Sequence, residues 1–287
     1  MDNPIIGIFI TATMFTLMFA LGVNHSFRQV TYLVRQPGLM ARSLLSVIVM
    51  VPGIVAVLIW VFSLPPAVAT GLAVLAAAPG APVGYKRVEM AGGEMAYGVN
   101  LQLTLALLAV VVTPLILAVF SSIFDLVIDR VAPLDVARQV AQVTFLPVIA
   151  GFLLRYFLPA FAERIGNPLR ILGNILLAIL LLLVVVVLAI APEVRMMLNL
   201  GWSATMAIVL MVALSLASGH FLGGPTQEKR TALAITSIAR NFGLALFIAG
   251  LSDYGQEFVP TLVTYLVLGG VLSIPYMIWS KGQLKKQ

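Results

Sequence analysis

Two stretches of the sequence place residues capable of chemistry inside otherwise apolar runs. One reads TALAITSIARNFGLALFIAG over residues 231–250 and contains Thr236, Ser237, Arg240 and Asn241. A charged side chain at the centre of a membrane span costs about 2.5–3.5 kcal/mol on insertion scales, so Arg240 must face protein or water. Two interpretations stay open. The guanidinium either caps carbonyls of a broken helix, or provides a positive charge that binds an anion or stands in for an ion.

The other stretch reads GLAVLAAAPGAPVGYKRVEMAGG over residues 71–93 and contains Pro79, Gly80 and Pro82. Two prolines remove backbone donors and clash with the preceding turn, so a smooth helix is not expected. Unwound backbone at membrane depth is tolerated only inside protein or beside a water-filled cavity. The sequence therefore predicts unwinding near 78–84 and near 236–241, with the two breaks in contact. A simple proline kink is the alternative for the first.

Further polar residues lie near the first break at membrane depth. Tyr85 comes directly after Gly84 at the end of the break, and Asn100 and Gln102 lie in the next apolar run. Each polar side chain either holds helices together or donates hydrogen bonds into a cavity. With the residues of both breaks, they form the predicted substrate-binding set: Pro79, Gly80, Pro82, Gly84, Tyr85, Asn100, Gln102, Thr236, Ser237, Arg240 and Asn241.

The composition indicates the elements that must position these residues. Of 287 residues, 61% are hydrophobic and 10% are charged, whereas a soluble domain has roughly 45–50% apolar and about 25% charged residues. These values exclude a soluble enzyme, a nucleic-acid binder and a disordered chain, and they predict an all-α polytopic membrane protein. Cysteine is absent, and no metal-ligand spacing, nucleophile triad or phosphate loop is present. No catalytic, metal or cofactor site is therefore predicted.

Nine membrane spans are expected from runs of about 20 apolar residues. They are 5–23, 39–62, 66–90, 95–120, 139–158, 170–191, 201–222, 231–250 and 258–279. The charged segment 121–137 is expected to be an outer amphipathic connector. The broken third and eighth spans occupy corresponding positions in two halves, which is the pattern of a secondary transporter with inverted repeats.

The distribution of basic residues predicts the orientation, because short cytoplasmic loops are enriched in Lys and Arg. With the N-terminus outside and the C-terminus in the cytoplasm, most of the 17 basic residues fall inside: Arg28, Arg35, Arg42, Lys86, Arg87, Arg155, Arg164, Arg170, Lys229, Arg230, Lys281, Lys285 and Lys286. The expected location is the inner (plasma) membrane. Lys86 and Arg87 either fix this orientation or line an inner mouth that attracts anions.

Three segments carry a resemblance to the bile acid–sodium symporter family. Residues 19–40, FALGVNHSFRQVTYLVRQPGLM, look like the family's first conserved helix and basic loop. Residues 63–115 resemble the region around its Cys-Pro-Gly-Gly break, and ITSIARNFGLAL resembles its second crossover segment. The resemblance implies inverted repeats with two crossed broken helices, a panel domain (spans one, five and six) and a core domain. The first repeat, 1–120, would lack its first helix, and the second would cover 138–287.

The sequence departs from this family where the resemblance places sodium ligands. Gly84 and Tyr85 stand at the family's Ser-Asn pair, Thr236 at its shared glutamate, and Arg240 at the neighbouring glutamine. Val47 stands at the glutamine of the second span, and Gly98 and Gln102 at hydroxyl positions. Since a carboxylate is replaced and a cation is added, sodium is not expected as a partner.

The expected function is alternating-access transport of small organic anions without sodium, by a protein that is not an enzyme and does not bind nucleic acid. Its partners would be the anion and the lipid bilayer. The alternatives are a proton-coupled transporter or uniporter, and a sensor or scaffold that keeps the fold without transport.

Overall fold

The computed structural model describes residues 4–82, 84–127, 133–190 and 200–284, and the regular elements in these ranges are helices. The first half contains α1 (Pro4–Asn24), α2 (Phe27–Val34), α3 (Pro37–Leu44), the π-helix η1 (Leu45–Met50), α4 (Val51–Phe62), α5 (Pro66–Ala77), α6 (Gly84–Met90) and α7 (Met95–Ile123). The second half contains α8 (Pro133–Val140), the π-helix η2 (Ala141–Phe145), α9 (Leu146–Phe157), α10 (Pro159–Ile190), α12 (Gly201–Leu222), α13 (Gln227–Ile238), α14 (Phe242–Leu251) and α15 (Gly255–Leu284). The all-α class is confirmed.

Seven helical stretches within the described residues are long and apolar enough to cross a membrane. They are Ile5–Asn24, Pro37–Phe62, Met95–Ile123, Leu134–Phe157, Pro159–Leu183, Gly201–Leu222 and Gly255–Leu284. Each corresponds to one of the nine expected spans. The expected third and eighth spans are instead pairs of shorter helices, α5 with α6 and α13 with α14. The count of nine crossings remains a prediction, because it requires each pair to act as one span.

In each of these two pairs of short helices, the interruption lies where the sequence is unfavourable for a continuous helix. Helix α5 ends at Ala77, two residues before Pro79, and α6 begins at Gly84. The second interruption is shorter than expected, because α13 continues to Ile238. The hydroxyls of Thr236 and Ser237 donate to carbonyls four residues earlier, at 2.8 and 2.9 Å, so both residues remain helical. Only residues 239–241 separate α13 from α14.

Two boundaries differ from the hydropathy pattern. Helix α10 begins at Pro159 rather than near 170, because Glu163, Arg164 and Asn167 reduce hydropathy without breaking a helix. The expected connector 121–137 is partly helical, since α7 reaches Ile123 and α8 begins at Pro133. Residues 128–132 of that connector lie outside the described part of the chain.

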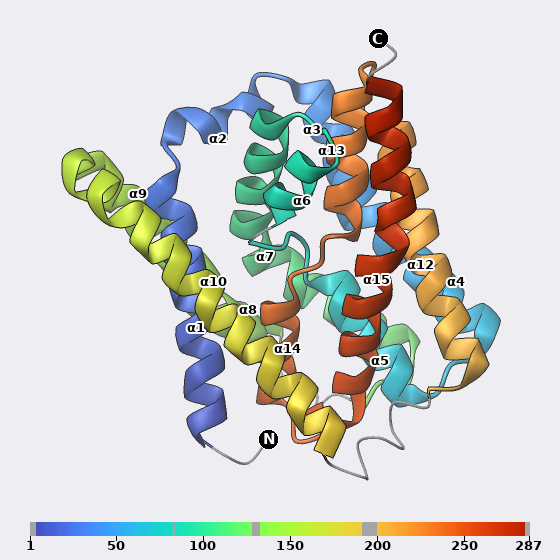
Figure 1. The fold of residues 1–287 in the computed structure, drawn as a ribbon. Helices are drawn as coiled ribbons and strands as arrows, with labels where there is room; N and C mark the ends of the chain where they lie inside the picture. The colour runs from blue at the N-terminus through green and yellow to red at the C-terminus, as the bar shows by residue number, and fades with distance from the viewer. Residues whose placement is uncertain (1–3, 83, 128–132, 191–199, 285–287) are drawn as a thin grey trace.

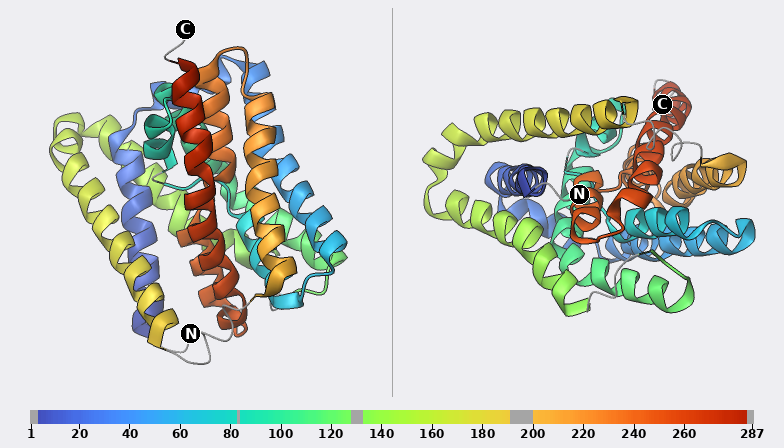
Figure 2. Two further views of the ribbon diagram at one scale, coloured as in Figure 1. Left: turned by 45° about the vertical axis from the view of Figure 1, so that its right-hand side comes forward. Right: turned by 90° about the horizontal axis from the view of Figure 1, so that it is seen from below.

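Helix α1 packs mainly against α9 and α10, and these three helices lie together on one side of the molecule (Figures 1 and 2). Glycines allow the close crossing of α1 and α9. A Cβ atom on Gly22 would lie 2.2 Å from the Val148 carbonyl oxygen, and one on Gly151 would lie 2.5 Å from the Phe19 carbonyl oxygen. Small residues at such crossings let helix backbones approach closely where lipid offers no hydrophobic driving force.

The other helices form the larger part of the bundle. Helix α12 packs on α13 and α4, α15 packs on α5 and α14, and α7 packs on α5, α6 and α13. The two interruptions lie inside this bundle, on the side that faces α1 and α10 (Figure 1). The start of α1 and the end of α15 lie at opposite ends of the bundle (Figure 1).

Candidate functional site

The two helix interruptions pair with each other. Pro79 and Arg240 form an isolated antiparallel bridge. The Asn241 backbone N–H donates to the Ala78 carbonyl at 2.9 Å, and the Ala81 N–H donates to the Ala239 carbonyl at 3.0 Å. The first N–H groups and the last C=O groups of a helix have no partners within that helix. Each interruption therefore satisfies part of the other's backbone, although the two segments are far apart in the sequence.

Asn241 also caps the helix that follows the second interruption. Its side-chain oxygen accepts a hydrogen bond from the Leu244 N–H at 3.0 Å, which is the geometry of an N-cap. The amide oxygen is thus partly engaged in starting α14. Asn241 also lines the cavity beside the interruptions.

The backbone of η1 provides an acceptor for Arg240. The Val51 N–H donates to Ser46 rather than to Val47, which is the π-helical pattern. The residue five positions after Val47 is Pro52, which has no N–H to donate. The Val47 carbonyl is therefore free of both ordinary helical partners, and it accepts a hydrogen bond from Arg240 Nη2 at 3.3 Å.

Two of the three Arg240 guanidinium nitrogens have no hydrogen-bond acceptor within the described part of the chain. The residue is 5% exposed, and its Nε and Nη1 atoms are buried with no acceptor among the described residues. A buried donor without a partner costs about 1–3 kcal/mol, and more when the group is charged. An acceptor that approaches these two nitrogens would offset this cost.

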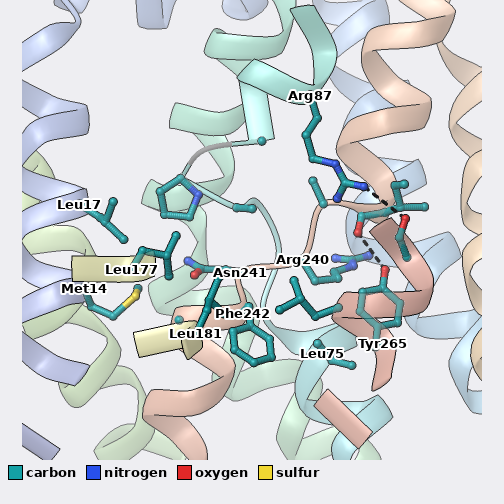
Figure 3. A pocket seen from close by; sticks show the side chains of 18 residues that line it. Met14, Leu17, Leu75, Arg87, Leu177, Leu181, Arg240, Asn241, Phe242 and Tyr265 are labelled. Atoms are coloured by element: carbon teal, nitrogen blue, oxygen red, sulfur yellow. Dashed lines mark hydrogen bonds between the residues drawn. The ribbon is translucent and has the colours of Figure 1, made fainter. Parts of the chain in front are cut away.

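A cavity of about 160 Å³ lies beside the interruptions, between the larger bundle and helices α1 and α10 (Figure 3). Its polar lining consists of Arg87, Arg240, Asn241 and Tyr265. Helices α1 and α10 contribute only apolar side chains, namely Met14, Leu17, Leu177 and Leu181. The cavity therefore has a cationic wall on the bundle side and an apolar wall opposite.

Two of the polar lining residues were not among the predicted site residues. Tyr265 in α15 donates its hydroxyl hydrogen to the Ile238 carbonyl at 2.8 Å. Arg87 in α6 donates from Nη2 to the Gly269 carbonyl at 3.2 Å and to Ser273 Oγ at 2.7 Å. Figure 3 shows Arg87 and Arg240 on the same side of the cavity, near the Tyr265 ring. Sequence alone offered a weak signal for Arg87, as a charge at the inner mouth, and none for Tyr265.

Four of the predicted site residues line this cavity: Pro82, Gly84, Arg240 and Asn241. Pro79 and Gly80 lie in the paired interruption rather than in the lining. Gly80 has φ +75°, and a Cβ atom there would lie 2.9 Å from Leu105 Cβ. A glycine is required at this position for both reasons.

Thr236 and Ser237 lie within α13, behind the interruption. Both are buried, and both donate their hydroxyl hydrogens to the helix backbone. Ser237 Oγ also lies 2.9 Å from Ser46 Oγ on η1. Neither residue lines the cavity in this conformation.

The α7 residues and Tyr85 also lie outside the main cavity. Asn100 donates to the Ala96 carbonyl at 2.8 Å, and Asn100 Oδ1 and Gln102 Nε2 have no hydrogen-bond partner among the described residues. Gln102 packs against the first interruption, where its Nε2 would lie 3.1 Å from a Cβ atom on Gly80. Tyr85 lines a separate small cavity of about 20 Å³ with His25 and Arg170.

The charged side chains that line the cavity are cationic. Within the described residues, no group of three or more His, Asp or Glu side chains is close enough to hold a metal ion. Where the structure describes the lining of the cavity, it includes two arginines and no carboxylate. This donor set suits a ligand that accepts hydrogen bonds and carries negative charge.

Comparison with known proteins identifies the family of the chain. The model of the sodium bile acid symporter family matches residues 11–197, a range that contains most of α1 and the first interruption. The match does not extend to the second interruption, so it does not cover Arg240. No curated protein matches the chain. Members of this family are transporters rather than enzymes. The chain belongs to the sodium bile acid symporter family and is a multi-pass membrane protein.

Proposed function

We propose that this protein moves small organic anions across the plasma membrane by alternating access, with the Arg240 guanidinium in place of a sodium ion. The observation that carries this proposal is Arg240 itself. It is 5% exposed, lines the cavity, and has two nitrogens without an acceptor among the described residues. A carboxylate or sulfonate accepts two parallel hydrogen bonds from a guanidinium, and such charge-assisted pairs are about twice as strong as neutral ones.

The walls of the cavity support alternating access. The polar residues come from the paired interruptions and α15, whereas α1 and α10 contribute apolar side chains. Contact between α1 and α14 is tight, since a Cβ atom on Gly243 would lie 2.3 Å from Met14 Sδ. In this proposal the α1–α9–α10 group is the panel, the rest is the core, and their relative movement opens the cavity to each side in turn.

Charge repulsion supports independence from sodium. Two unit charges about 4 Å apart repel by about 4 kcal/mol at an effective dielectric constant of 20. The nearby Thr236 hydroxyl donates to its own helix, and the described residues that line the cavity include no carboxylate. A sodium ion beside Arg240 would therefore have a cationic neighbour and no compensating anion from the lining residues.

The proposed topology follows from the basic residues of the loops. It places the N-terminus outside, the C-terminus in the cytoplasm, and each interrupted pair across the membrane as a single span. The opposite positions of the α1 start and the α15 end support an odd number of crossings (Figure 1).

Replacement of sodium by potassium at constant ionic strength is expected to leave transport unchanged. The reason is that the fixed positive charge of Arg240 is present in the site in both salts. The measurement is uptake of labelled propanesulfonate by proteoliposomes, because this anion does not cross lipid unaided, with protein-free vesicles as the background. Uptake at background level in both salts would favour a non-transporting role. A steep dependence on sodium would refute the built-in cation.

A further inference from the structure

Two cations, rather than one, line the cavity beside the interruptions. Arg240 comes from the second interruption and Arg87 from α6, directly after the first. Arg87 is anchored through Nη2, which donates to the Gly269 carbonyl and to Ser273 Oγ on α15. Both acceptors are neutral, so the anchoring fixes the position of the guanidinium without neutralising its charge.

The lining residues of the cavity do not compensate these two charges. The cavity is formed by apolar residues, Asn241 and Tyr265 in addition to the two arginines. Buried charges in proteins are ordinarily paired or bound to counter-ions. A ligand with one negative charge would leave one of the two guanidiniums uncompensated, whereas a ligand with two negative charges would neutralise both.

The size of the cavity limits the ligand further. At about 160 Å³ it is close to an engineered apolar cavity of about 150 Å³ that holds one benzene ring. A compact chain of a few carbon atoms with an anionic group at each end fits this volume. A ligand of steroid size does not fit in the conformation described.

We propose that the cavity selects compact dianions, in particular short dicarboxylates, with one carboxylate at Arg240 and the other at Arg87. This inference rests on the proposed function, because it assigns a second charge to the same anion site. Arg240 holds the first carboxylate through Nε and Nη1, which have no other acceptor among the described residues. Arg87 is half-buried and sets the preference for the second charge.

Succinate and butyrate form a matched pair of probes, since each has a four-carbon chain and only succinate has a second carboxylate. Hydrogen bonds to charged groups contribute about 1.5–3 kcal/mol, which is about a tenfold to hundredfold difference in affinity. Because Arg87 is only half-buried, the lower end is expected. Isothermal titration of the purified protein in sodium-free buffer should give a Kd for succinate about tenfold below that for butyrate.

Arg87→Gln should remove this preference selectively. The Kd for succinate is expected to rise to near that for butyrate, so the ratio of the two Kd values should fall from about ten toward one. Lys86→Gln is the matched control, because it removes an adjacent positive charge that does not line the cavity. It should keep the preference for succinate. Arg87→Lys keeps the charge and should keep most of the preference for succinate. If Arg87 were merely structural, both variants would lose this preference or both would keep it.

The outcomes distinguish this inference from the proposed function. Equal affinity of the wild-type protein for both probes, or a preference that survives Arg87→Gln, would overturn the two-cation site and leave the anion site at Arg240 intact. Binding of neither probe by the wild-type protein would overturn both. The wild-type comparison needs no variant, so it decides the question even where Arg87→Gln fails to fold.

Discussion

Arg240→Gln is expected to lower the affinity for butyrate by about tenfold to a hundredfold, because it removes a charge-assisted bidentate contact worth about 1.5–3 kcal/mol. Glutamine ends where Arg240 Nε stands and loses the hydrogen bond from Nη2 to the Val47 carbonyl, so a loss of affinity has to be separated from a loss of stability. The measurement is isothermal titration in sodium-free buffer. The thermal unfolding midpoint should be recorded in parallel to exclude a folding defect.

Arg42→Gln is the control for the change in net charge. Arg42 is exposed, and its Nε donates to a carbonyl within its own helix. This variant should bind butyrate like the wild-type protein. Arg240→Lys should give an intermediate affinity, since it keeps the charge and loses the planar fork of donors. Unchanged affinity in Arg240→Gln would mean that Arg240 is structural and that the anion site lies elsewhere.

The same position offers a test in the opposite direction. Arg240→Gln combined with Thr236→Glu brings back, at both positions, the residue types that the family resemblance assigns to the sodium site. If the guanidinium stands in for sodium, the double variant should bind anions in a sodium-dependent way, whereas each single variant should not.

Gly80→Val is expected to have the largest effect on stability among single substitutions at the interruptions. Gly80 has φ +75°, a conformation that costs a residue with a side chain about 1–3 kcal/mol. The new Cβ atom would also lie 2.9 Å from Leu105 Cβ and 3.1 Å from Gln102 Nε2, and overpacking of this kind costs about 1–3 kcal/mol more. The unfolding free energy should fall by about 2–6 kcal/mol.

Thermal or denaturant unfolding of the purified protein measures this effect. Gly53→Val is the matched control, because a Cβ atom on Gly53 would meet nothing within 4 Å. It should unfold close to the wild-type midpoint. Should Gly80→Val be as stable as Gly53→Val, the paired interruptions would not have the rigid geometry described above.

Sequence alone predicted the positions of both interruptions, because the cause is local. Pro79 and Pro82 lack N–H donors, and Arg240 cannot remain at membrane depth without a polar environment. The extent of the second interruption was less predictable. Thr236 and Ser237 could have belonged to the break, but their hydroxyls bond back to the helix, so α13 continues to Ile238.

The partner of Arg240 was only partly predicted. Carbonyls of a broken helix were expected as its acceptors, with an anion as the alternative. The acceptor is the Val47 carbonyl on η1. A signal for it was present in the sequence, since Pro52 lies five residues after Val47 and cannot donate to it. Which helix would bring that carbonyl to Arg240 depends on tertiary packing, which no local pattern contains.

The apolar wall of the cavity could not be predicted. Met14, Leu17, Leu177 and Leu181 are ordinary residues of apolar helices, and nothing in their types distinguishes a cavity-facing from a lipid-facing position. The same holds for Tyr265, whose role depends on the Ile238 carbonyl at the end of another helix. These positions follow from how α1, α10 and α15 pack.

The most direct test of the central claim is to locate an anion in the protein by anomalous diffraction. Cacodylate suits this purpose, because it is a compact anion with two oxygens, two methyl groups and an anomalously scattering arsenic, and the chain has no cysteine for it to modify. At alkaline pH, in sodium-free crystals, an arsenic peak is expected in the cavity, with its oxygens about 3 Å from Nε and Nη1 of Arg240. Crystals should be grown from protein that binds cacodylate in solution. The account would be contradicted if their arsenic peaks lay only outside this cavity.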